Sequence, residues 1–332
     1  MNQSKENKSR WRLVAGLKLF IAAGALFFIW TKVFQKESIQ DVLVQFNLVF
    51  QDGYRRFLLL AALLLMPVNW LAEAVKWRMV IQKMEGISLL RSAGAVLTGL
   101  TVSFFTPNRV GEYAGRVMYL SKGNRIKGTL LTVIENMAQL VVTLVLGAAA
   151  LPVFLYRYAR MPLYVYLSVL IVSVCFAVLV VALFLRTSSI HKSLARFSFF
   201  KKHERFIHVT KVALPGLLLA ILGLSWFRFL VFSGQLYLLL LVFGVQVDYP
   251  SAMLMIILTF FVMTLIPTFA FADLGVRGAA GTFFFAYITS HLAGVVYATL
   301  TLWLINLALP SAAGALLLAV VSPQRKESHG QF

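Results

Sequence analysis

The segment "FFTPNRVGEYAGRVMYL", residues 104–120, places an asparagine, two arginines, a glutamate and two glycines inside an otherwise apolar chain. Pro107 lacks an amide proton and disfavours helix at the residue before it, whereas Gly111 permits close approach of another backbone. The segment therefore predicts a helix that breaks near Pro107 and resumes near Gly111, with Glu112 and Arg116 one turn apart.

The rest of the chain has the composition of an integral membrane protein. Of its 332 residues, 60% are hydrophobic and 13% are charged, and the mean hydropathy is +0.83. A bilayer core takes about 20 apolar residues of helix, and only helices or closed barrels satisfy their backbone there. Because the apolar runs are long and do not alternate, we expect an all-α, polytopic helical bundle forming one integral membrane domain over 1–332.

Six apolar runs are long enough to cross a membrane fully. They are 13–34, 57–76, 128–155, 162–185, 213–242 and 292–320. Two more apolar regions, 92–121 and 251–288, are interrupted by polar residues. The run 13–34 follows a basic segment but is too long for a signal-peptide core, so we interpret it as a retained signal anchor.

The distribution of basic residues decides how the two interrupted regions are expected to cross. Five stretches hold 22 of the 31 Lys and Arg residues: 1–12, 76–91, 109–127, 186–211 and 322–332. All five can lie on the cytoplasmic side only if 92–121 enters and leaves the membrane on that side. The same logic makes 251–288 a hairpin that enters from outside and turns near Pro267.

The sequence thus predicts six full spans plus two oppositely oriented re-entrant hairpins, in a bacterial inner membrane with cytoplasmic tails 1–12 and 322–332. The second half then repeats the first upside down, with half-repeats 13–155 and 162–320. Inverted repeats with broken helices are typical of transporters whose substrate site lies near the middle of the membrane. A plain eight-crossing topology is the alternative.

Charged residues inside a membrane are costly and usually line a pathway or bind a partner. In the first hairpin, Arg109 and Arg116 are suited to phosphate, and the amide-rich start of the helix near Gly111 favours an anion. Glu112 is expected to pair with these arginines. The alternative is that Glu112 and Arg116 form a structural ion pair beside a small-residue packing face.

The second hairpin contains "IPTFAFADLGVRGAAG", residues 266–281, which repeats the pattern. Asp273 and Arg277 stand four residues apart after Pro267, and Gly275 allows close contact. Both hairpin tips therefore present a carboxylate and a guanidinium, and we expect them to face one shared chamber. The alternative is that the second pair only pins its turn.

Isolated polar residues in the spans complete the predicted site. Glu135 and Asn136 lie too deep in 128–155 to reach the surface, so Glu135 needs an arginine partner. Arg228 is expected to bind a phosphate or a carbonyl of a broken helix. Glu73 and Lys76, three residues apart, are interpreted as an interfacial pair.

The predicted substrate-binding residues are Asn108, Arg109, Glu112, Arg116, Glu135, Asn136, Arg228, Asp273 and Arg277. The residues predicted to shape the hairpins are Pro107, Gly111, Pro267 and Gly275.

Motifs for catalysis or metal binding are not found in the sequence. The five histidines lie in loops or at helix ends without metal-site spacing, and the single cysteine, Cys175, excludes a disulfide within the chain. We therefore predict no cofactor, no metal and no catalytic residue, although membrane transferases often lack recognisable motifs. The formal charge of +19 is spread between spans, which favours orientation and lipid contact over nucleic-acid binding.

The motifs "TPNRVGEYAGRVMYL", "IENMAQLVVTLVLG" and "IPTFAFADLGVRGAAG" resemble those of the lysylphosphatidylglycerol synthase transmembrane-region family, also called flippase-like membrane proteins. The resemblance rests on Pro107, Arg109, Gly111, Glu112, Arg116, Glu135, Pro267, Gly275, Val276 and Arg277.

Two departures from the family pattern stand out. Gly278 occupies the place of the glutamate that closes the family's second motif, and Asp273 stands where the family more often has glycine. Members that make aminoacylated lipid carry a soluble transferase domain after the membrane region, whereas this sequence stops at "SPQRKESHGQF". The resemblance implies the part that moves lipid without the part that makes it.

The first hypothesis is therefore a protein that moves a phospholipid or another amphipathic lipid between leaflets, with membrane lipids as its ligands. The arginines would hold a phosphate, and the carboxylates would balance them, accept a headgroup amine or take up a proton. The alternative is an accessory subunit or transferase acting on polyprenyl-linked or lipid-linked substrates. A lipid-synthesising enzyme or a glycosyltransferase is the candidate protein partner.

Overall fold

The computed structural model describes residues 44, 47–106, 109–187, 215–266 and 270–320, and their regular secondary structure is helical. The predicted all-α class is confirmed for these residues. Five helical segments are long and apolar enough to cross a membrane: Gly53–Ile81, Lys122–Arg157, Leu163–Leu185, Pro215–Val242 and Leu292–Ala319. They coincide with five of the six predicted spans. The predicted span 13–34, both tails, Pro107, Asn108 and Pro267 lie outside the described residues.

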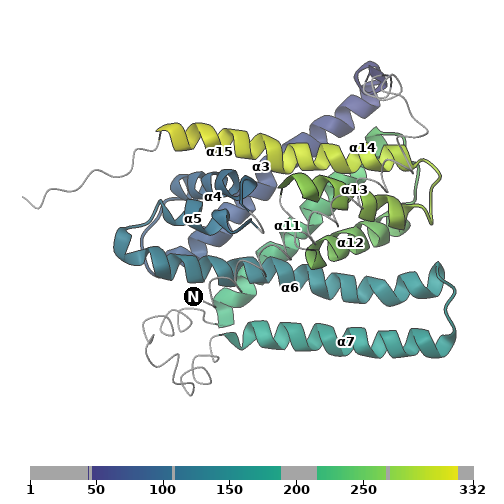
Figure 1. Cartoon of the computed structure of the whole chain (residues 1–332), viewed down its shortest axis with the longest axis horizontal. Helices are drawn as coiled ribbons and strands as arrows, with labels where there is room; N and C mark the ends of the chain where they lie inside the picture. The colour runs from purple at the N-terminus through teal and green to yellow at the C-terminus, as the bar shows by residue number, and fades with distance from the viewer. Residues whose placement is uncertain (1–43, 45–46, 107–108, 188–214, 267–269, 321–332) are drawn as a thin grey trace, which may run out of the picture.

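The long helices form the frame of the molecule. They are α3(Gly53–Ile81), α6(Arg125–Arg157), α7(Leu163–Leu185) and α11(Pro215–Val242), and a short turn, η3(Lys122–Asn124), precedes α6. The last apolar run forms α14(Leu292–Trp303), the π-helical turn η4(Leu304–Ala308) and α15(Leu309–Val320). Helices α6 and α7 lie side by side along the long axis, and α3 and α11 cross them obliquely (Figure 1).

Polar side chains set where several helices begin. Asp52 accepts a hydrogen bond from the Tyr54 amide at the start of α3. Ser88 caps the helix that begins at Leu89, and Asp248 caps the helix that begins at Tyr249. Each of these side-chain oxygens satisfies an amide that has no partner within the first turn of the helix.

The region predicted to break near Pro107 forms two helices, α4(Leu89–Phe104) and α5(Gly111–Val117). They pack antiparallel, because Gly115 lies against Gly99 and Gly111 lies against Val102. A methyl group added at Gly115 would stand 2.6 Å from Gly99 Cα, and one at Gly111 would stand 2.5 Å from the Val102 carbonyl oxygen. The glycines thus allow the two backbones to touch.

The second interrupted region forms α12(Tyr249–Leu265) and α13(Ala270–Phe285), which pack against each other. The two hairpins stand at opposite ends of α6. Near its start, Asn124 donates to Glu85 just before α4, and just past its end Tyr158 donates to Ser251 in α12. Oppositely placed hairpins are what an inverted repeat requires, and the half-repeats 13–155 and 162–320 stay a prediction.

The final helix covers the first hairpin. Helix α15 lies along α4 in Figure 1, and Thr101 in α4 donates to the Ser311 carbonyl at 2.7 Å. A methyl group at Gly314 would stand 2.2 Å from the Leu97 carbonyl oxygen, so these backbones also touch. The hairpin α4–α5 is therefore held by a helix that is distant in the sequence.

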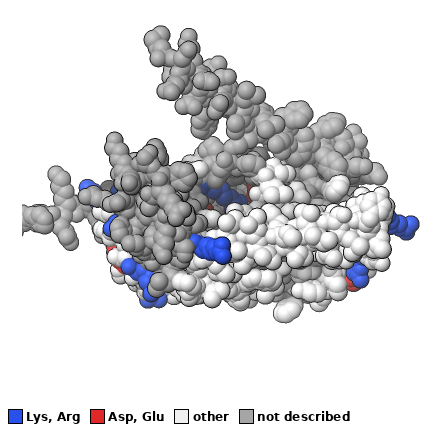
Figure 2. All heavy atoms as spheres, turned by 90° about the horizontal axis from the view of Figure 1, so that it is seen from below, with Lys and Arg blue, Asp and Glu red and all other residues white. Residues whose placement is uncertain are grey.

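The outer surface is that of a multi-pass membrane protein. Apolar side chains of α7, including Leu167, Ile171 and Val174, are exposed. On the face drawn in Figure 2, charged atoms gather mainly toward the two ends, with an apolar belt between them. Such a belt matches the hydrocarbon layer of a bilayer.

Candidate functional site

A cavity of about 450 Å³ lies where the two helix breaks approach the frame of long helices. Its charged lining residues are Arg109, Asp273 and Arg277 from the two hairpins, and Arg228 from α11. Figure 2 shows a hollow in the molecule with both basic and acidic atoms at its floor. The cavity thus has three arginines and one aspartate, a formal excess of two positive charges.

The two breaks meet at this cavity. Arg109 Nη2 lies 3.5 Å from Asp273 Oδ2, and Arg277 Nη2 donates to the same oxygen at 2.9 Å. Arg109 has a φ of +56°, a left-handed conformation that is uncommon for residues other than glycine. The Arg109–Asp273 contact therefore joins the first break to the second, and both hairpins contribute charge to one chamber.

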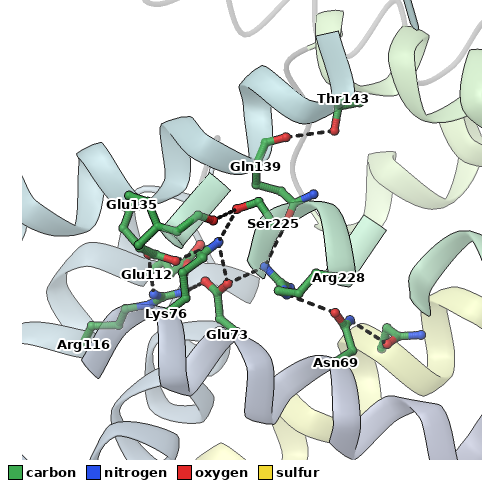
Figure 3. A network of polar contacts seen from close by, with 12 residues as sticks. Asn69, Glu73, Lys76, Glu112, Arg116, Glu135, Gln139, Thr143, Ser225 and Arg228 are labelled. Carbon is green, nitrogen blue, oxygen red and sulfur yellow. Dashed lines mark hydrogen bonds and ion pairs between the residues drawn. The ribbon is translucent and has the colours of Figure 1, made fainter. Parts of the chain in front are cut away.

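A buried set of charges, which we call the charge network, lies beside the cavity (Figure 3). It consists of Glu73, Lys76, Glu112, Arg116, Glu135 and Arg228. Three carboxylates face three cations, so the network is formally neutral. Neutrality and close pairing are what allow charges to remain in a medium where an isolated ion is very costly.

Arg116 is at the centre of the network. Its Nη1 donates to Glu135 at 3.0 Å, and its Nη2 donates to Glu73 at 2.5 Å and also to Glu112. Lys76 Nζ completes the set, at 2.8 Å from Glu135 and 2.9 Å from Glu73. Side chains from α3, α5 and α6 are thereby held together, and Glu135 has the arginine partner that its depth requires.

Arg228 belongs to both the charge network and the cavity wall. Its Nη1 donates to Glu73 and, at 3.4 Å, to Gln139, while its Nε donates to Asn69 Oδ1 at 3.0 Å. The guanidinium also stands over the ring of Trp70 at 5.7 Å. This cation is thus paired on one side and open to the cavity on the other.

Glu73 and Lys76 were interpreted as an interfacial pair, and that interpretation is wrong. Their exposed fractions are 2% and 0%, and Lys76 also donates to Ser225 on α11 at 3.4 Å. The reason is that α3 continues to Ile81 and packs along α11, so Lys76 lies inside the helix bundle. The apolar residues Trp77, Val80 and Ile81 after Lys76 were the signal for this continuation.

The start of α5 differs from the expected anion site. The Gly111 amide donates to Thr106 Oγ1 at 2.8 Å, so the first amide of this helix already has a partner. Helix α5 also has only seven residues, which limits its dipole. The positive charge offered to a ligand here comes from arginine side chains.

The predicted site residues fall into four groups. Four of them line the cavity: Arg109, Arg228, Asp273 and Arg277. Three more belong, together with Arg228, to the charge network: Glu112, Arg116 and Glu135. Asn136 is half-buried and contributes to neither, and Asn108 lies outside the described residues. Gly275 is buried in α13.

Sequence analysis missed a set of amide side chains at the cavity. Asn69 Nδ2 donates to Asn306 Oδ1 at 3.4 Å, and Asn306 Nδ2 donates to Gln235 Oε1 at 3.2 Å. Asn69, Gln139 and Asn306 line the cavity. Single amides within long apolar runs were the signal, since a buried amide needs partners.

In a comparison with protein families, residues 15–325 of the chain match the family model described as the lysylphosphatidylglycerol synthase TM region. Comparisons with curated proteins and with solved structures gave no match. The family is one of membrane proteins in lipid metabolism or transport. Since the match covers nearly the whole sequence, the chain belongs to the lysylphosphatidylglycerol synthase transmembrane-region family.

Proposed function

We propose that this protein moves a lipid with a phosphate-bearing headgroup between the leaflets of a bacterial inner membrane. The observation that carries the proposal is the contact of Arg109 with Asp273, which joins two helix breaks at the wall of an arginine-rich cavity. Membership of the family supports a role in lipid metabolism or transport. The charged cavity between the two hairpins supports movement of the lipid.

In this proposal both hairpins are re-entrant. The pair α4–α5 enters from the cytoplasmic side and the pair α12–α13 from the outside, and both termini are cytoplasmic. The cavity then lies near the middle of the bilayer, where irregular backbone survives only if it is buried or lines a polar space. A headgroup could reach it from either side after a movement of one hairpin.

The cavity offers the chemistry that a phosphate needs. Arg277 is buried, and its Nε and Nη1 have no hydrogen-bond partner among the described residues. A guanidinium can bind two phosphate oxygens at once, and pairing with a cation lowers the cost of carrying a phosphate through hydrocarbon. Arg228 and Arg109 add charge on the other walls.

The acyl chains would remain in the lipid phase beside the helix breaks. Phe105 and Val110 flank the first break, Leu265 flanks the second, and all three are exposed apolar residues. Their neighbours Arg109 and Ile266 line the cavity. The apolar rim beside a charged cavity fits an amphipathic ligand whose two parts occupy different surroundings.

The test is transport of fluorescent phosphatidylglycerol in liposomes that contain the purified protein. Dithionite should quench the inner-leaflet probe that remains protected in protein-free liposomes. The variant Arg277→Gln should slow transport by about tenfold or more, since a hydrogen bond to a charged group contributes about 1.5–3 kcal/mol. Arg56→Gln, an exposed arginine away from the cavity, is the matched control.

Liposomes with the wild-type protein that protect the inner probe as well as empty ones would contradict the proposal. A covalent change in a polyprenyl-linked substrate, found with the same preparation, would favour the alternative of a transferase or its accessory subunit.

A further inference from the structure

Among the described residues, the carboxylates at and beside the cavity are paired with protein cations. Asp273 contacts Arg109 at 3.5 Å and Arg277 at 2.9 Å. Glu73, the acid of the charge network that pairs with the lining residue Arg228, also contacts Arg116 and Lys76. A ligand ammonium that reached one of these carboxylates would therefore lie next to two or three protein cations, whose like charge opposes it.

The charge network and the cavity together carry an excess of one positive charge. The four carboxylates are Glu73, Glu112, Glu135 and Asp273. The five cations are Lys76, Arg109, Arg116, Arg228 and Arg277. One monoanion balances this set, whereas an added cation would increase the excess in a low-dielectric site.

The buried polar atoms that lack a partner on the cavity lining are all donors. They are Nε and Nη1 of Arg277 and the indole Nε1 of Trp70 and of Trp303. An ammonium also carries only donors, so it cannot satisfy any of them. Phosphate, hydroxyl and ether oxygens accept hydrogen bonds and are the kind of partner that these donors lack.

The amide oxygens of the lining are turned toward protein donors. Asn69 Oδ1 accepts from Arg228 Nε, and Gln139 Oε1 accepts from Arg228 Nη1. Asn306 Oδ1 accepts from Asn69 Nδ2. The strong acceptors of the cavity are thus engaged in the same way as its carboxylates.

We infer that the cavity binds an anionic phosphodiester headgroup whose substituent is rich in hydroxyls and carries no amine, such as a glycerol or a sugar. The inference rests on the proposed function and names its ligand class. A lysyl or other amino headgroup is disfavoured by like charge and by the engagement of the carboxylate and amide oxygens among the described lining residues. The inferred headgroup thus differs from that of lysylphosphatidylglycerol, the aminoacylated lipid after which the family is named.

Binding to the purified full-length protein in detergent tests this selectivity without any transport step. The probes are dihexanoyl phosphatidylglycerol, its lysyl ester and the soluble compound glycerophosphoglycerol. Fluorescence of Trp70 and Trp303, which line the cavity, and a shift in Tm report binding. The lysyl ester should bind at least about tenfold more weakly than phosphatidylglycerol. Equal or tighter binding of the ester, or no binding of either lipid, would overturn the inference.

Two variants test whether the lipid binds in the cavity. Arg277→Gln should weaken phosphatidylglycerol binding by about tenfold, and Arg56→Gln should leave it unchanged. A result in which Arg277→Gln retains full affinity, while its Tm without lipid stays that of the wild type, would contradict the assignment. The comparison of the two lipids on the wild-type protein keeps the test valid if Arg277→Gln does not fold.

The third probe separates two sources of the same chemistry. Weaker binding of glycerophosphoglycerol assigns the site to a membrane lipid, and equal binding supports the headgroup class but assigns it to a soluble phosphodiester. Selective binding in detergent together with absent transport in liposomes would remove the proposed function and leave this inference standing.

Discussion

Arg228 donates to Glu73 across the contact between α11 and α3, and the same guanidinium forms part of the cavity wall. Glu73 in turn accepts from Arg116, which also holds Glu112 on the first hairpin. An anion in the cavity that attracts Arg228 would weaken its hold on Glu73. The cavity and the hairpin α4–α5 therefore share one set of charges.

Removing one acid from the charge network should strongly destabilise the protein. Glu135→Gln leaves Lys76 and Arg116 buried with one carboxylate fewer, and breaking a buried pair in this way costs about 3–5 kcal/mol. The measurement is thermal unfolding of the purified protein in detergent. Glu85→Gln, in a half-buried turn outside the charge network, is the matched control and should have a much smaller effect.

The double variant Glu135→Gln with Lys76→Met restores neutrality to the network. It should recover part of the lost stability, with a coupling of about 0.5–3 kcal/mol between the two sites. Purely additive losses would show that charge balance does not govern the stability of this cluster.

Enlarging the glycine contact within the first hairpin should also destabilise the protein. Gly115→Ala places a methyl group 2.6 Å from Gly99 Cα, where only backbone could yield, and we expect a loss of about 1–3 kcal/mol. Gly123→Ala is the control, because nothing lies within 4 Å of an added methyl group there. Equal Tm values for the two variants would mean that α4 and α5 do not touch as described.

The turn before α6 should lose stability in acid. Partial burial favours the neutral form of Glu85, but hydrogen bonds from Asn124 and Ser121 outweigh it and lower the pKa of this carboxyl. A lowered folded-state pKa stabilises the fold above the ordinary carboxyl value of about 4.3, and that stability disappears as the pH falls through the folded value. The Tm difference between wild type and Glu85→Gln should therefore be present at pH 7 and should shrink as the pH falls below the ordinary carboxyl pKa. A Tm difference between the two proteins that grows as the pH falls would contradict a lowered pKa of Glu85.

The proposed topology predicts which loops face each side of the membrane. Ser121 and Ser290 are exposed and lie at the ends where the first and second hairpins begin or end. In a Cys175→Ser background, Ser290→Cys should react with an impermeant thiol reagent added outside intact cells. Ser121→Cys should react only after the membrane is opened. Reaction of both from outside would favour eight plain crossings.

Local sequence features predicted the frame and the positions of the helix breaks. Span length follows from apolar run length, and five predicted spans agree with the helices because bilayer thickness sets that length. The break between Phe104 and Gly111 follows from the conformational preferences of Pro107 and Gly111, which lie close together in the sequence. Both kinds of signal act over short stretches of chain, so they are visible without knowledge of the packing.

The partners of the buried charges could not be predicted in the same way. Which acid meets Arg116 depends on how α3 and α6 are rotated about their axes, and rotation is set by packing along the whole helix. Glu73 was consequently assigned to the surface, although it lies 2.5 Å from Arg116. The amides of Asn69, Gln139 and Asn306 were missed for the same reason. Their hydrogen-bond partners lie on other helices, so the sequence alone does not identify them.

The cover that α15 forms over α4 has a consequence for biosynthesis. The ribosome delivers α4 and α5 to the membrane before Ser311 and Gly314 have been made. The hairpin therefore lacks its contacts with α15 while the second half of the chain is made. During that interval the Leu97 carbonyl lacks its contact with Gly314. The first hairpin thus reaches its described packing only after α15 has been made and has docked on α4.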